Sequence, residues 1–165
     1  MLRSFLFFLL FCCCQLKAQT SLLKIFKDGL EQAMPADGVS EADQQAILKA
    51  VTIELKKHVK FEKNGDAKAL FKSHARIYYE WKGLGPRRII ARKLSQVDEL
   101  NGVQGSYLVS LGADVYRSFD NKTKKWSPWH KGSSAFFPSN LQVVKSGGKF
   151  RVLPNTQLKS HVPTL

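Results

Sequence analysis

Cysteine is absent from residues 15–165, because the three cysteines of the chain lie side by side at residues 12–14. A domain formed by the later residues therefore has no disulfide, no cysteine nucleophile and no thiolate metal ligand. Small secreted toxins and growth factors depend on disulfides for stability, so this absence argues against those classes. Long apolar runs are also absent after the N-terminal segment. No later segment approaches the length needed to span a bilayer.

Recognised catalytic motifs are missing too. The chain has neither a glycine-rich phosphate-binding loop nor a Gly-x-Ser-x-Gly elbow. Its four histidines are scattered, and none has a second histidine at metal-ligand spacing. We therefore predict no catalytic residues, no metal and no cofactor. An acid–base pair of His74 and Asp114 stays open as an alternative, although Asp114 alternates with apolar neighbours and is expected to point away from the core.

The N-terminal segment has the layout of a secretory signal. Arg3 precedes an unbroken apolar stretch at residues 5–14, and Ala18 offers a small residue for cleavage before Gln19. We predict a signal peptide at residues 1–18 and an exported protein, either periplasmic or secreted. Lipid anchoring through Cys13 and an uncleaved N-terminal anchor stay open as alternatives.

Length and composition predict one domain at residues 19–155, followed by a flexible tail at residues 156–165. Apolar residues at helical spacing predict a first helix that ends near Met34. Ser40, with Asp43 three positions later, is a variant of the capping box and predicts the start of a second helix. We place Lys56, Lys57 and His58 in the last turn of that helix, where they would complement its dipole.

From about residue 67 the apolar period changes to two, which indicates strands with one buried face. Turn residues occur at positions 83–86, 101–102, 120–123 and 146–148. The strands that we expect are residues 75–82, 88–98, 103–115, a short one through Trp126, 141–145 and 149–153. Gly105 and Gly112 indicate bulges or bends in the long third strand. The prediction is an α+β fold in which two N-terminal helices pack on a curved antiparallel meander sheet of five to six strands.

This order of elements resembles the NTF2-like and cystatin-like rolls, in which a helix lies across a bent antiparallel sheet. The resemblance is carried by the helices at residues 22–58 and by the long strands at residues 75–81, 103–115 and 149–153. It implies a cavity between helices and sheet that can hold a ligand or, in an NTF2-like enzyme, catalytic groups. The inhibitory loop of cystatins is not matched, because Gln142-Val143-Val144 is followed by Lys145 rather than by Ala-Gly.

Positive charge is the strongest functional signal. Without Arg3 and Lys17, the 26 basic residues fall to 24 against 13 acidic residues, which leaves a net charge of +11. The excess lies in residues 60–165, which carry 19 basic and 7 acidic residues. We expect these cations to gather on one outward-looking face of the sheet, where aromatic rings interleaved with them bind an anionic partner. The candidate ligand-binding residues are Arg76, Tyr78, Arg88, Arg92, Lys125, Trp126, Trp129 and Arg151.

The sequence thus predicts an exported basic binding module whose partner is an anionic polymer or a phospholipid surface. Two other interpretations stay open. In one, the positive charge serves solubility alone; in the other, Trp126 and Trp129 cap one end of the core. The chain is alternatively a small NTF2-like enzyme or ligand carrier that uses the cavity, or a structural protein whose strand edge pairs with another copy. Asn121-Lys122-Thr123 matches the N-glycosylation acceptor pattern within a predicted turn.

Overall fold

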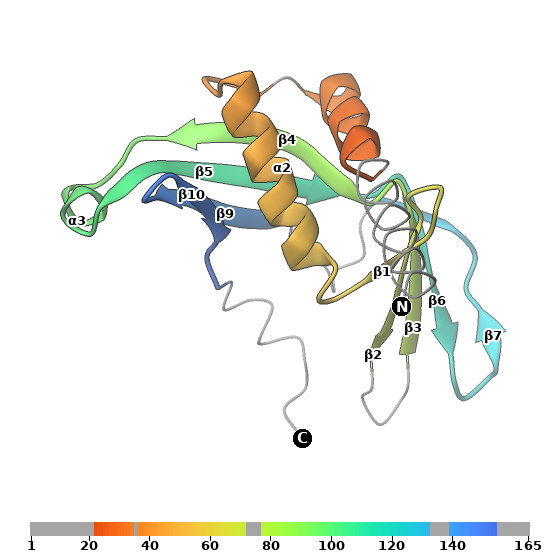
Figure 1. Cartoon of the computed structure of the whole chain (residues 1–165). Helices are drawn as coiled ribbons and strands as arrows, with labels where there is room; N and C mark the ends of the chain where they lie inside the picture. The colour runs from red at the N-terminus through yellow and green to blue at the C-terminus, as the bar shows by residue number, and fades with distance from the viewer. Residues whose placement is uncertain (1–21, 35, 72–76, 133–138, 155–165) are drawn as a thin grey trace, which may run out of the picture.

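The computed structural model describes residues 22–34, 36–71, 77–132 and 139–154. Two helices lie on one side of a four-stranded sheet, and a second sheet extends away from one end of it (Figure 1). The predicted signal peptide, His74, Arg76 and the tail at residues 156–165 lie outside the described residues. None of the helices in the described ranges is long and apolar enough to cross a membrane.

Ten strands form two antiparallel sheets in the described part of the chain. The six-stranded sheet contains β1 (Lys60–Phe61), β2 (Ala67–Phe71), β3 (Ile77–Lys82), β6 (Val115–Asp120) and β7 (Lys125–Trp126) in that spatial order, with β8 (His130–Lys131) also paired to β6. The four-stranded sheet has the order β10 (Lys149–Val152), β9 (Asn140–Ser146), β5 (Val103–Gly112) and β4 (Gly85–Arg92). The α+β prediction is confirmed, with the strands divided between two sheets.

The first helix covers residues 22–33 and is followed by α2 (Glu41–Leu55). Ser40 caps α2 as predicted, because its Oγ accepts a hydrogen bond from the Asp43 N–H at 3.2 Å. The placement of Lys56, Lys57 and His58 in the last turn is wrong. Lys56 is already the C-cap, and the next two side chains turn back toward Glu54.

Residues 77–120 form one long hairpin that is bent in its middle. Strands β3 and β4 are separated by two residues, as are β5 and β6, yet β3 pairs with β6 while β4 pairs with β5. The predicted turn at residues 83–86 is therefore wrong, because the chain turns a corner there without reversing. The strand predicted at residues 88–98 is also too long. A capping box of Ser95 and Asp98 starts α3 (Gln96–Leu100), which with Gly102 connects β4 to β5.

The corner is built from glycines and one ion pair. Gly83 has a φ of +64°, a conformation that side chains rarely adopt. The guanidinium of Arg87 donates both to the Gly83 carbonyl and to Asp114 Oδ1, the latter at 2.7 Å. A Cβ at Gly85 would lie 2.9 Å from the ring of Phe26, so the first helix is seated directly on the bend. The second sheet is thus held at a fixed angle to the first.

The core lies between the helices and the four-stranded sheet and continues along the inner face of the second sheet. Alternation along β3 is confirmed: Tyr79 and Trp81 are buried, whereas Tyr78 and Lys82 are exposed. In β5, Tyr107, Val109 and Leu111 are buried between half-buried neighbours, and Ser106 is buried as well. Helix α2 contributes a buried apolar stripe that consists of Ile47, Leu48, Val51 and Leu55.

Asp43 links α2 to the sheet beneath it. Its carboxylate accepts hydrogen bonds from Lys145 Nζ at 2.9 Å and from the Tyr107 hydroxyl at 3.2 Å. The hydrogen bond from Lys145 is the main cause that holds the pKa of Asp43 below its usual value.

A depressed carboxyl pKa contributes stability above the unfolded-state pKa, and this contribution is lost as the pH falls through the folded-state value. Asp43→Asn should therefore make the free energy of unfolding less dependent on pH between about pH 5 and about pH 2. Urea unfolding at several pH values measures this, with Asp28→Asn on the exposed side of the first helix as the control. If the stability of the wild type and of Asp43→Asn depended equally on pH, the contribution of the Asp43 carboxylate to stability would be contradicted.

Candidate functional site

The structure places the predicted site residues on both sheets. Arg88 and Arg92 lie on β4 and Arg151 lies on β10, at opposite edges of the four-stranded sheet. Arg88 is also engaged by Asp37, whose Oδ2 lies 2.6 Å from its Nη2. The remaining predicted residues of the described ranges belong to the second sheet or to the loop beside it, namely Tyr78, Lys125, Trp126 and Trp129.

The strand register shows which side chains share the exposed face of the six-stranded sheet. Tyr78 on β3 is opposite Phe119 on β6, which in turn is opposite Trp126 on β7. Side chains in register lie on the same face, and Tyr78 is exposed whereas its neighbour Tyr79 is buried. We call the face that carries Tyr78 the outer face. The same register adds Glu80, Lys82, Val115, Arg117 and Lys131 to it.

Arg117 lies between two tryptophans on this outer face. Its guanidinium carbon is 4.4 Å from the ring centroid of Trp126 and 4.7 Å from that of Trp129. Lys82 Nζ is 4.8 Å from the Trp129 ring as well. Each such contact stabilises by about 0.5–1 kcal/mol at an exposed site. Together these residues and the aromatic pair beside them form a cation–aromatic cluster, which consists of Tyr78, Lys82, Arg117, Phe119, Trp126 and Trp129.

The cluster is a surface feature. Trp126 and Trp129 keep 38% and 39% of their surface exposed, and Tyr78 keeps 37%. Neither tryptophan belongs to the hydrophobic core, so the interpretation that they cap one end of it is wrong. Phe119 joins the rings, with its centroid 5.8 Å from that of Tyr78 and 5.3 Å from that of Trp126. The rings therefore support each other and hold cations at the surface.

Glu80 balances part of the positive charge. Its Oε2 accepts from Arg117 Nε at 2.7 Å, and its Oε1 lies 3.6 Å from Lys68 Nζ. Lys68 also contacts Glu62 at 3.2 Å, and the pKa of Lys68 is raised, mainly by the hydrogen bond to Glu62. Arg117 and Lys68 are thus on either side of one acidic side chain.

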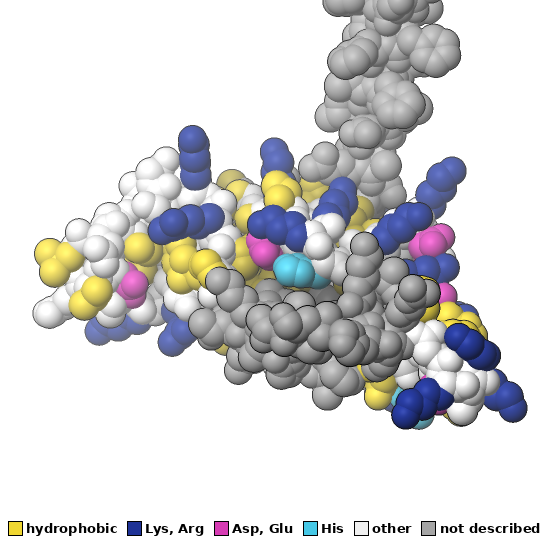
Figure 2. Space-filling view, turned by 90° about the horizontal axis from the view of Figure 1, so that it is seen from below, with side chains coloured by type: hydrophobic (Ala, Val, Ile, Leu, Met, Phe, Trp, Pro, Cys, Tyr) yellow, Lys and Arg dark blue, Asp and Glu magenta, His cyan; other side chains and the backbone are white. Residues whose placement is uncertain are grey.

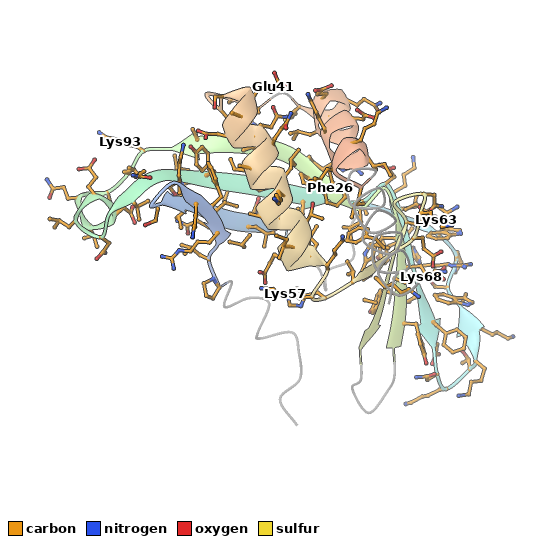
Figure 3. The ribbon with its side chains drawn as sticks, viewed as in Figure 1. Phe26, Glu41, Lys57, Lys63, Lys68 and Lys93 are labelled. Carbon is orange, nitrogen blue, oxygen red and sulfur yellow. The ribbon has the colours of Figure 1, made fainter. Side chains whose placement is uncertain are left out.

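A shallow pocket of about 520 Å³ lies where the segment after α2 adjoins β1 and β2. We call it the lysine pocket. Its lining includes Lys57, just beyond the end of α2, and Lys68 on β2, both labelled in Figure 3. Lys57 also forms an ion pair with Glu54 at 2.7 Å. The pocket is lined by Lys56, Lys57, His58, Val59, Lys60, Phe61, Lys68 and Ala69.

Positive charge alone does not single out a site. On the face of the molecule seen in Figure 2, Lys and Arg side chains are spread around much of the outline. This differs from the expected gathering of cations on one outward-looking surface, because the basic residues of β4, β6 and β10 belong to different sheets and edges. What distinguishes the outer face of the six-stranded sheet is that its cations lie against aromatic rings.

The ionisable side chains on β3 and at the corner are engaged separately from one another. Asp114 points away from the core, as its alternation predicts, and binds Arg87, whereas Glu80 binds Arg117. Tyr79 is buried in the core, where burial raises its pKa. Among the described residues, no group of three or more acidic, histidine or cysteine side chains is arranged to hold a metal ion.

Comparison of the chain with protein-family models, with curated proteins and with solved structures gives no match.

Proposed function

We propose that this protein is a binding module for an anionic polymer and that the cation–aromatic cluster is its docking site. The observation that carries the proposal is the position of Arg117 between the exposed rings of Trp126 and Trp129. A guanidinium presents a planar fork of N–H donors that matches carboxylate, sulfate and phosphate groups. Rings on both sides restrict the motion of this fork, so little conformational freedom is lost when an anion binds.

The residues around Arg117 extend the same chemistry. Lys82 adds a second cation next to Trp129, and Lys131 lies in the same cross-strand row as Lys82. The exposed edges of Trp126 and Tyr78 supply apolar contact area for the body of a polymer. A flat face with spaced cations suits an extended ligand better than a small one. The layout of residues 1–18 supports action outside the cytoplasm as part of this proposal.

The alternatives to this function differ in where they place the ligand. An NTF2-like enzyme or ligand carrier would use the space between helices and sheet. A phospholipid partner would contact the basic residues and take the exposed tryptophan rings into its headgroup region. The cation–aromatic cluster favours a polymer. Its cations are held against aromatic rings, so they are suited to bind anionic groups at defined positions rather than to attract a charged surface in general.

Lysine substitutions test the location of the site. Lys82→Gln combined with Lys131→Gln should weaken retention on immobilised heparin and lower the slope of log affinity against log salt by about 1–2. The matched control is Lys93→Gln with Lys149→Gln, which removes the same charge from the four-stranded sheet and the segment after β4. The control should leave the slope near that of the wild type. Equal losses in both pairs would remove the case for a localised site.

A further inference from the structure

The lysine pocket and the cation–aromatic cluster are connected by one cross-strand row. Lys60 on β1 is in register with Lys68 on β2, which is in register with Glu80 on β3. Glu80 is in turn in register with Arg117 on β6. Adjacent strands are about 4.8 Å apart, so the row covers about 14 Å of the outer face. It begins at two lysines that line the pocket and ends at the arginine of the cluster.

Glu80 lies in the middle of this row and holds its cations together. Only 16% of its side chain is exposed, and its two carboxylate oxygens face Arg117 on one side and Lys68 on the other. An anionic ligand that follows the row therefore approaches two cations that share one internal counterion. Removing that negative charge frees hydrogen-bonding capacity on both sides.

The contacts that the aromatic rings already make indicate the class of polymer. Binding of single-stranded nucleic acid uses bare ring faces on which bases stack. Here Arg117 lies over one face of both tryptophans, and Phe119 packs edge-on against Tyr78 and at a tilt of 60° against Trp126. The rings are thus largely used to position cations. The row places cations on β1, β2 and β6, with Glu80 between the last two. Cations set out along a line in this way suit sulfate or carboxylate groups repeated along a chain of sugars.

We infer that the lysine pocket and the cation–aromatic cluster are the two ends of one binding track for an acidic polysaccharide, with Glu80 as the counterion inside it. This inference rests on the proposed function, because the cluster is the docking site that it extends. It adds the class of polymer, the second end of the site and a residue that limits affinity.

Replacement of the internal counterion gives the sharpest test. Glu80→Gln should raise the affinity for a heparin octasaccharide by about three- to tenfold. The matched control is Glu99→Gln on α3, which gives the same change in net charge at the far end of the long hairpin and should change affinity less than twofold. Glu62→Gln frees Lys68 without disturbing Arg117 and should give a smaller gain, which keeps the test valid if Glu80→Gln does not fold. Equal gains in Glu80→Gln and Glu99→Gln would overturn the role of Glu80.

Substitutions in the pocket test the other end of the track. Lys56→Gln with Lys60→Gln should weaken octasaccharide binding while leaving a disaccharide, which reaches only one end, nearly unaffected. Loss of binding in the Lys82/Lys131 variant without loss in the Lys56/Lys60 variant would overturn the track but keep the proposed function. Loss in neither would overturn both. Tighter binding of oligothymidylate than of the octasaccharide at equal charge would assign the site to nucleic acid and overturn the polysaccharide.

Discussion

Alanine at both Trp126 and Trp129 is expected to lower the affinity for heparin oligosaccharides by about ten- to a hundredfold, the largest functional effect that we predict. The two rings lie 4.4 and 4.7 Å from the Arg117 guanidinium, and without them Glu80 would be its remaining anchor and the apolar contact area would be lost. The loss should therefore exceed that caused by removing any one lysine. Isothermal titration at low and moderate salt measures the change directly.

Two controls separate this role from stability and from general apolar contact. Trp126→Phe with Trp129→Phe keeps a ring on each side of Arg117 and should retain most of the affinity. Val97→Ala with Leu100→Ala removes other exposed apolar side chains, which are 65% and 88% exposed on α3, and should leave binding unchanged. Wild-type affinity in the double alanine variant at the tryptophans would rule out the cluster as the docking site.

Alanine at Gly83 is expected to destabilise the protein by about 1–3 kcal/mol, the largest stability effect that we predict. Gly83 has a φ of +64°, and a Cβ added there would collide with the carboxylate of Asp114. That carboxylate binds Arg87 across the corner, so the collision also disturbs the contact that fixes the angle between the sheets. Urea unfolding followed by tryptophan fluorescence measures the difference.

The turn between β9 and β10 supplies the matched control. Gly147 has a φ of +54°, but a Cβ there would have no atom within 4 Å. Gly147→Ala therefore reports the backbone strain alone, about 1–2 kcal/mol. The additional loss in Gly83→Ala is the contribution of the crowded corner. A loss no greater than that of Gly147→Ala would show that the bend does not depend on close approach at this position.

The elements that follow local patterns could be predicted from the sequence. The apolar stripe of α2 and the alternation of Tyr79 and Trp81 with Tyr78 each depend on a periodicity that is visible in a short window. The corner could not be predicted in this way. The sequence at residues 83–86 satisfies both a reversing turn and a bend, and only the pairing of β3 with β6 decides between them.

In the candidate site, too, the residues that depend on local sequence could be predicted, whereas those that depend on strand pairing could not. Trp126 and Trp129 were recognisable as exposed aromatic residues near cations, but Arg117 and Phe119 were missed. Their place beside the tryptophans follows from the register of β6 with β7, which joins residues across a turn and cannot be read from charge or periodicity alone. Arg88 was included on charge, yet Asp37, 51 positions earlier in the chain, already binds it.

Titration of the isotopically labelled protein with a heparin hexasaccharide tests the central proposal most directly, because each indole N–H gives its own NMR signal. The indole signals of Trp126 and Trp129 and the side-chain Nε signal of Arg117 should shift together, with the amides of β3, β6 and β7. Shifts confined to β4 and β10, around Arg92 and Arg151, would contradict the proposal and move the binding surface to the four-stranded sheet.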